Sequence, residues 1–143
     1  MTTERIVAIT GGAGALGSAL ASHLVAKGYR VALFDTDRAK ERLTKIAQDL
    51  GAERLIGVAG DFAVAAAWES ALAATKAAFG GPPTHAVLVA GGWDGGAPLY
   101  AAKEDVYAKM ISSNVDTAYR ALRALLPAMV EKKHGSKIGR AHV

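Results

Sequence analysis

A glycine-rich segment near the start of the chain has the residue types and spacing of a phosphate-binding turn. Gly12-Ala13-Gly14-Ala15-Leu16-Gly17 follows the pattern G-x-G-x-x-G, and it lies between an apolar, β-prone run at residues 6–10 and a stretch with leucines at helical spacing. Glycines in such a strand–turn–helix permit a tight turn and a close approach of the backbone to a pyrophosphate, which sits on the helix N-terminus. We therefore expect a dinucleotide to bind here.

An acidic residue stands where a dinucleotide site needs one. Asp35 ends the second apolar run, about 20 residues after the glycines, and its carboxylate could accept both hydrogen bonds of an adenosine ribose diol while repelling a 2′-phosphate. NAD is therefore predicted over NADP. Two alternatives stay open: Asp35 or Asp37 could cap the following helix, and Arg38 is near enough in sequence to accommodate a 2′-phosphate, so NADP is not excluded.

These residues need a scaffold, and the sequence predicts one of alternating strands and helices. Strands are expected at residues 6–10, 30–34, 55–58 and 86–90, with amphipathic helices between them and a long helix over 104–133 that Pro127 kinks. Alternation of this kind is typical of a parallel sheet covered on both faces. We predict a three-layer α/β Rossmann fold with strand order 3-2-1-4, in one domain spanning residues 1–137.

The glycine segment also carries a family resemblance. Thr10-Gly11-Gly12-Ala13-Gly14-Ala15-Leu16-Gly17 resembles the T-G-x-x-x-G-x-G signature of the short-chain dehydrogenase/reductase family, with Ala15 in place of the middle glycine. Gly14 instead satisfies the T-G-x-x-G-x-x-G spacing of the family's extended and atypical branches, so the branch stays open. The resemblance implies that Thr10, Gly11, Gly14, Leu16 and Gly17 bind the cofactor.

Further segments resemble the family in the expected order. Asp61-Phe62 is similar to the pair whose carboxylate meets the adenine amino group, and Ala90-Gly91, followed by Gly92, stands where the family has N-N-A-G. Leu88 and Val89 replace both asparagines of that motif. The resemblance thus adds five residues to the cofactor site: Asp61, Phe62, Ala90, Gly91 and Gly92.

Asn114 resembles the asparagine of the family's catalytic tetrad, which helps to hold a water in a proton relay. It also lies on the apolar stripe of the long helix, so it could instead be a buried, hydrogen-bonded asparagine. The family's tyrosine and lysine form a Tyr-x-x-x-Lys motif, which this chain does not contain, and the positioning serine is expected with them beyond residue 143. The acid–base step therefore lacks an agent among these residues.

The activity that the resemblance implies is hydride transfer between NAD(P) and the carbonyl or alcohol group of a small molecule. A narrower similarity of residues 11–18 and 89–96 to dihydropteridine reductases suggests a flat substrate, on which Trp93 could stack unless it is a packing anchor. Two alternatives remain: an extended-type epimerase or dehydratase acting on nucleotide sugars, and a dinucleotide-binding module without catalysis.

Bulk properties exclude several other classes. The chain has 143 residues, no cysteine and four scattered histidines, so we expect no metal site. The net charge of +4 comes largely from the last residues without interleaved aromatic side chains, so no nucleic-acid partner is expected. We find neither a secretion signal nor a membrane span, which predicts a cytoplasmic protein, and we expect a homo-oligomer at full length.

The last six residues, Ile138 to Val143, match the translation of a common sequencing-adapter DNA in one frame. We therefore expect 138–143 to be a non-native tail on a truncated chain. An open edge at the fourth strand and an uncovered apolar face around Met110, Leu122 and Leu125 should follow.

Overall fold

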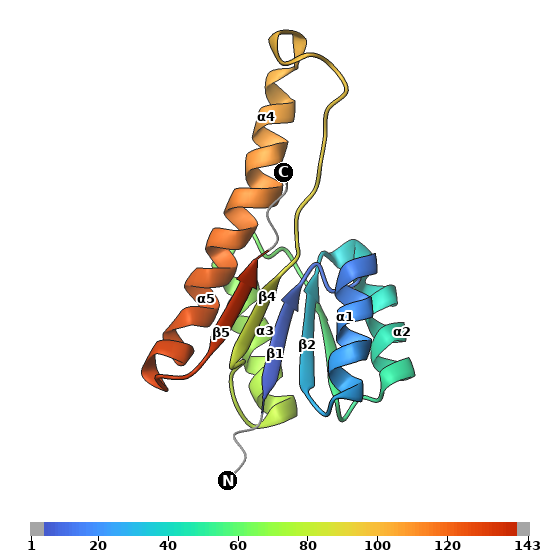
Figure 1. Ribbon diagram of the computed structural model, residues 1–143, viewed down its shortest axis with the longest axis vertical. Helices are drawn as coiled ribbons and strands as arrows, with labels where there is room; N and C mark the ends of the chain where they lie inside the picture. The colour runs from blue at the N-terminus through green and yellow to red at the C-terminus, as the bar shows by residue number, and fades with distance from the viewer. Residues whose placement is uncertain (1–4, 140–143) are drawn as a thin grey trace.

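The computed structural model describes residues 5–139, which form a single parallel sheet with helices on both faces (Figure 1). The strands are β1 (Ile6–Thr10), β2 (Arg30–Asp35), β3 (Leu55–Ala59), β4 (His85–Leu88) and β5 (Ser136–Gly139). Their order in the sheet is β3-β2-β1-β4-β5. The predicted Rossmann-type α/β fold and the order 3-2-1-4 of its first four strands are confirmed.

Five α-helices and three short turns connect the strands. The helices are α1 (Ala15–Ala26), α2 (Lys40–Leu50), α3 (Ala65–Phe79), α4 (Glu104–Ile111) and α5 (Thr117–Glu131). The turns are the 3₁₀ segments η1 (Asp37–Ala39) and η2 (Leu99–Ala101) and the π-helical turn η3 (Ser112–Asp116). No helix within residues 5–139 is long and apolar enough to cross a membrane.

The period of two in the strands divides the apolar core into two layers. On one face Val7 and Ile9 of β1 pack with residues of α1 and α2, and on the other Ile6 and Ala8 pack with residues of α3 and α5. All five residues of β1 are buried. This double burial explains why the run at residues 6–10 is continuously apolar rather than alternating.

The predicted open edge at the fourth strand is wrong, because β5 pairs with β4 in parallel register from His85 opposite Ser136 to Leu88 opposite Gly139. The backbone N–H of Ser136 donates to the carbonyl oxygen of Thr84 at 3.3 Å, which sets this register. Ile138 and Gly139 of the predicted non-native tail therefore lie in the sheet. Residues 140–143 of that tail are outside the described part of the chain.

The predicted uncovered helix face is also wrong at Leu122 and Leu125, whereas Met110 is half-buried at the cleft. Leu125 is 1% exposed in the core, and Leu122 packs against the same cluster. The face of α5 that contains Leu125 packs against the sheet. The exposed apolar residues of α4, η3 and α5 lie on another face. They include Tyr107, Ile111, Val115 and Tyr119.

The second and third strands each end one residue later than predicted, and two elements differ by more than one residue. The fourth strand begins at His85 and ends at Leu88 instead of running from 86 to 90, because the side chain of Thr10 takes the backbone N–H groups of Val89 and Ala90. The long helix is interrupted by η3 and ends at Glu131, with Pro127 inside α5. After β4 the chain runs alongside α4, well beyond the end of the sheet (Figure 1).

Candidate functional site

A cleft of about 1070 Å³ lies at the carboxyl ends of β1, β2 and β4, where the strand order reverses. Open α/β sheets bind ligands at this switch point, because the helices on either side of it lie on opposite faces of the sheet. Every residue predicted to bind the cofactor lines the cleft, whereas Asn114 does not. These lining residues are Thr10, Gly11, Gly14, Leu16, Gly17, Asp35, Asp61, Phe62, Ala90, Gly91 and Gly92.

The glycine turn between β1 and α1 is packed too closely for side chains at several positions. Gly11 has φ +67°, and a Cβ atom there would lie 2.9 Å from the backbone nitrogen of Ala90. A Cβ atom at Gly17 would collide with the carbonyl oxygen of Gly11 and lie 2.8 Å from Cα of Gly12. The two glycines let the turn approach the segment after β4 and let α1 approach the turn.

Gly14 has a different role, because it is the N-cap of α1 and makes no side-chain cap hydrogen bond. A Cβ atom there would meet only the carbonyl oxygen of Gly11, at 3.2 Å. The first turn of α1 therefore presents its backbone N–H groups at the cleft wall formed by Ala15, Leu16 and Gly17. A helix N-terminus of this kind binds phosphate groups.

The carboxylate of Asp35 connects the end of β2 to the glycine turn. Its Oδ2 accepts a hydrogen bond from the backbone N–H of Ala13 at 2.9 Å, and its Oδ1 accepts one from Thr36 at 2.8 Å. The alternative that Asp35 or Asp37 caps the second helix is wrong, since the N-cap of α2 is Ala39, without a side-chain cap hydrogen bond. Two hydrogen bonds thus hold Asp35 in the cleft wall, with further lone pairs available.

Asp61 and Phe62 form the wall beyond β3. The ring of Phe62 packs against Phe34 and Trp68 with centroid distances of 5.5 and 4.9 Å, and the indole N–H of Trp68 donates to the carbonyl oxygen of Phe62 at 3.0 Å. Asp61 is exposed, and its Oδ1 accepts from the N–H of Ala63 at 3.1 Å. The aromatic cluster therefore fixes the backbone that presents the Asp61 carboxylate.

Thr10 joins the two sides of the cleft, a role that the sequence did not reveal. Its Oγ1 accepts hydrogen bonds from the backbone N–H of Val89 at 3.1 Å and of Ala90 at 3.2 Å. The side chain is buried at 6% exposure. Because one hydroxyl serves both amides, Thr10 holds the segment after β4 beside the glycine turn even though Leu88 and Val89 replace the family's asparagines.

Asn114 lies in the π-helical turn η3 and is bonded on both sides of its carboxamide. Its Oδ1 accepts from the N–H of Gly92 at 3.3 Å, and its Nδ2 donates to the carbonyl oxygens of Gly92 at 2.8 Å and Met110 at 2.9 Å. This pattern agrees with the hydrogen-bonded alternative from the sequence. The proton-relay role is not tested by these contacts.

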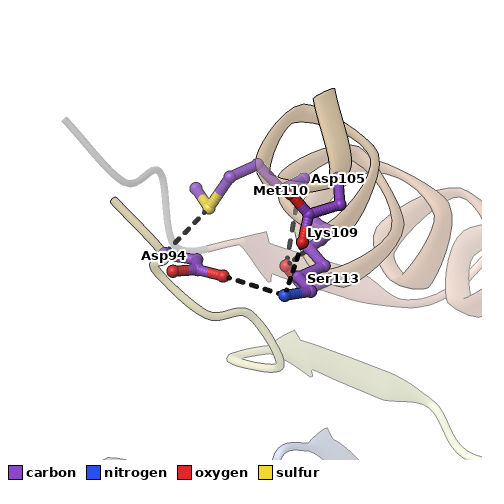
Figure 2. Close-up of polar contacts among 5 residues, drawn as sticks. All are labelled: Asp94, Asp105, Lys109, Met110 and Ser113. Atoms are coloured by element: carbon purple, nitrogen blue, oxygen red, sulfur yellow. Dashed lines mark hydrogen bonds and ion pairs between the residues drawn. The ribbon is translucent and has the colours of Figure 1, made fainter. Parts of the chain in front are cut away.

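Trp93 and Asp94 form the outer wall of the cleft together with α4. Figure 2 shows the ammonium group of Lys109 beside Asp94, with Nζ–Oδ2 distances of 3.4 Å to Asp94 and 3.2 Å to Asp105. Hydrogen bonds and charge attraction, first from Asp105 and then from Asp94, raise the pKa of Lys109. Trp93 is 77% exposed, so the prediction that it could be a packing anchor is wrong.

The described tyrosines offer no acid–base group in the cleft. Tyr100, Tyr107 and Tyr119 are 93%, 66% and 55% exposed, and neither they nor Tyr29 are among the lining residues. Arg38, on η1, is also absent from the lining. Among the described residues, the cleft therefore has a glycine turn and a carboxylate suited to a nucleotide, and it has no tyrosine for proton transfer.

Known proteins with similar sequences are dehydrogenases. The chain is 33% identical over 134 residues to cis-2,3-dihydrobiphenyl-2,3-diol dehydrogenase of Pseudomonas sp. (strain KKS102), covering 91% of this chain and 47% of that protein. It is 29% identical over 142 residues to 2,5-dichloro-2,5-cyclohexadiene-1,4-diol dehydrogenase of Sphingobium indicum, covering 94% of this chain and 53% of that protein. The chain thus spans about half the length of these relatives.

Structural similarity covers nearly all of the chain. Serine dehydrogenase from Escherichia coli superposes with a TM-score of 0.84 at 29% identity, covering 94% of this chain and 60% of that structure. The sequence model of the short chain dehydrogenases matches residues 5–139, which include the glycine turn, Asp35, Asp61 and Asn114. The chain belongs to the short-chain dehydrogenase/reductase family, whose members are oxidoreductases that use a nicotinamide cofactor.

Proposed function

We propose that this chain is the cofactor-binding part of an NAD-dependent dehydrogenase or reductase that acts on the alcohol or carbonyl group of a small molecule. The observation that carries the proposal is the carboxylate of Asp35, held in the wall of a glycine-lined cleft by the N–H groups of Ala13 and Thr36. The nicotinamide group supplies reversible hydride transfer when bound. The residues of this chain bind and orient it.

The charge of the wall supports NAD over NADP. A carboxylate at the end of the second strand suits the two hydroxyls of a ribose and repels a 2′-phosphate. The cation that could offset this repulsion, Arg38, is not among the residues that line the cleft. Asp61 adds a second carboxylate to the same wall, which further disfavours an additional phosphate.

The relatives suggest a substrate class. The two dehydrogenases described above act, by their names, on a diol of dihydrobiphenyl and a diol of dichlorocyclohexadiene. We propose a cyclic diol as the substrate, oxidised at one hydroxyl. The proton of that hydroxyl needs a base, which we expect outside these 143 residues because they contain no Tyr-x-x-x-Lys. The chain alone should bind the cofactor without turnover.

Calorimetric titration of the chain with NAD⁺ and NADP⁺ tests the cofactor proposal. Loss of a charged hydrogen bond costs about 1.5–3 kcal/mol, so NAD⁺ should bind about tenfold to a hundredfold more tightly than NADP⁺. Asp35→Asn should remove most of this preference, whereas Asp37→Asn, in η1 two residues away, should preserve it. Equal affinity of the unmodified chain for both nucleotides would contradict the assignment of Asp35.

We also propose that the whole protein is a homo-oligomer. Tyr107, Ile111, Val115 and Tyr119 repeat at four-residue spacing along α4, η3 and α5 and are 36% to 66% exposed. A row of apolar side chains on one helix side favours burial against another surface. Sedimentation of the full-length protein as a monomer at all concentrations would refute this proposal.

A further inference from the structure

Trp93 is an unusual residue for its position. It lines the cleft, yet its side chain is 77% exposed, whereas Trp68 is 3% exposed and donates its indole N–H to a carbonyl oxygen. Exposing so much aromatic surface forgoes the free energy that burial would supply. The core therefore does not account for a tryptophan at position 93.

The backbone on both sides of Trp93 is nevertheless held in place. On one side Gly92 exchanges two hydrogen bonds with the carboxamide of Asn114. On the other, the N–H of Asp94 donates to Sδ of Met110 at 3.1 Å, and the Asp94 carboxylate pairs with Lys109 (Figure 2). An exposed ring between two anchored neighbours is presented to the cleft at a defined place.

Gly95, which follows Asp94, makes room for the ring of Trp93. A Cβ atom at Gly95 would lie 2.9 Å from Cζ2 and 3.3 Å from Cε2 of Trp93. The benzene part of the indole thus lies against backbone, closer than any side chain at Gly95 would permit. The surface of the indole turned away from Gly95 remains available to a ligand, in agreement with its exposure.

The surroundings of the ring favour an uncharged ligand. The ammonium group of Lys109 is already paired with the carboxylates of Asp94 and Asp105. The other lining residues of α4 and η3 are Ala108, Met110, Ser112 and Ser113, which offer apolar contacts and hydroxyls without net charge. This combination matches a flat ring that bears hydroxyl groups.

We propose that Trp93 is a stacking platform that selects cyclic diols whose rings are flattened by double bonds over saturated-ring or acyclic diols. This inference rests on the proposed dehydrogenase function and adds a specificity-determining residue to it. Stacking on an aromatic side chain contributes about 0.5–1.5 kcal/mol beyond the buried area. Selectivity of about threefold to tenfold for a flat ring is therefore expected.

The test follows the indole N–H signals of the chain's two tryptophans by NMR during ligand titrations, with and without NAD⁺. The planar probe is catechol, and the controls are cis-1,2-cyclohexanediol, which is puckered, and 1,2-ethanediol, which is acyclic. Catechol should shift the Trp93 signal more than that of Trp68, which also lines the cleft but is only 3% exposed. Both controls should bind at least about threefold more weakly.

Two variants complete the test. Trp93→Leu should weaken catechol binding to the level of cyclohexanediol, and Trp93→Phe should restore most of the difference. Equal catechol affinity in Trp93→Leu and the unmodified chain, or an unshifted Trp93 signal, would overturn the inference. Failure of NAD⁺ to bind would instead refute the proposed function, so the two failures are distinguishable.

Discussion

The carboxamide of Asn114 forms hydrogen bonds with both polar groups of Gly92, accepting from its N–H at 3.3 Å and donating to its carbonyl oxygen at 2.8 Å. The two hydrogen bonds resemble those between paired residues of neighbouring β-strands, with a side chain in place of the second strand. It joins η3 to the loop after β4, two segments that no regular secondary structure connects. Asn114 therefore holds the start of the outer wall at Gly92, while Met110 and Lys109 hold it at Asp94.

Asn114→Ala should loosen this wall. The change leaves the N–H and carbonyl groups of Gly92 without their side-chain partner, and an unsatisfied, partly buried polar group costs about 1–3 kcal/mol. We expect lower stability in urea denaturation and faster hydrogen exchange at the amides of Gly92 and Asp94. Ser112→Ala, on the same turn but exposed, is the control. Unchanged exchange at Gly92 would contradict the anchoring role.

Thr10→Val should separate the two sides of the cleft. The substitution preserves shape and removes the hydroxyl oxygen that accepts from the N–H groups of Val89 and Ala90, so we expect a loss of about 1–3 kcal/mol. Thr10→Ser retains the oxygen and should recover most of that stability. Urea denaturation of the three proteins measures both effects. A valine variant as stable as the serine variant would be inconsistent with this account.

Gly17→Ala should disrupt the glycine turn. The added methyl group would collide with the carbonyl oxygen of Gly11, which is backbone and cannot rotate away. Overpacking of this kind costs about 1–3 kcal/mol and should abolish or strongly weaken nucleotide binding by moving α1. Gly81→Ala is the matched control, because its nearest neighbour, Cδ1 of Ile6, lies at 3.9 Å. Thermal unfolding and NAD⁺ titration of both variants provide the measurements.

His85 should make the stability of the sheet depend on pH. Burial, then the charge of His134 and then that of Arg5 lower the pKa of His85 below its usual 6.5. The imidazole ring also packs edge-on against Tyr29, with 6.4 Å between the ring centroids, and its Nδ1 lies 2.8 Å from Oγ1 of Thr84. Three segments therefore surround the ring, and none of these neighbours is a carboxylate that would stabilise its protonated form.

The sign follows from proton binding. As the pH falls through 6.5, the unfolded chain protonates His85 before the folded chain does, so the free energy of unfolding decreases. Above this window both states hold the neutral ring and the contribution is constant. The melting temperature should thus fall between about pH 7.5 and pH 5.5, and less steeply in His85→Gln. Identical slopes for the variant and the unmodified chain would exclude His85 as the source.

The sequence predicted the sheet best where burial determines residue type. The run Ile6–Thr10 is buried along its whole length, and its predicted ends are those observed. β5 escaped prediction because all four of its residues are exposed, and Ser136 and Lys137 carry no apolar signal. Its place comes from backbone pairing with β4, which periodicity cannot reveal.

The site shows the same division. The glycines and Asp35 could be found because a tight turn and a ribose each demand one residue type at a fixed spacing. The contacts of Thr10 with Val89 and Ala90 join positions 79 and 80 residues apart, so no local pattern indicates them. Trp93 was noticed as a residue type, but only its exposure distinguishes a ligand contact from a packing role.

The π-helical turn η3 lets one continuous helical stretch contribute both to the cleft and to the core. A turn with i→i+5 bonding contains about one residue more than an α-helical turn, which shifts the phase of all later side chains by roughly 100°. α4 can thereby direct Lys109 and Met110 toward the cleft while α5 directs Leu125 into the core. The relative orientation of α4 and α5 therefore depends more on the number of residues between 112 and 116 than on their types. Deleting one residue there would rotate the side chains of one helix relative to those of the other, whereas most single replacements would leave both helices aligned.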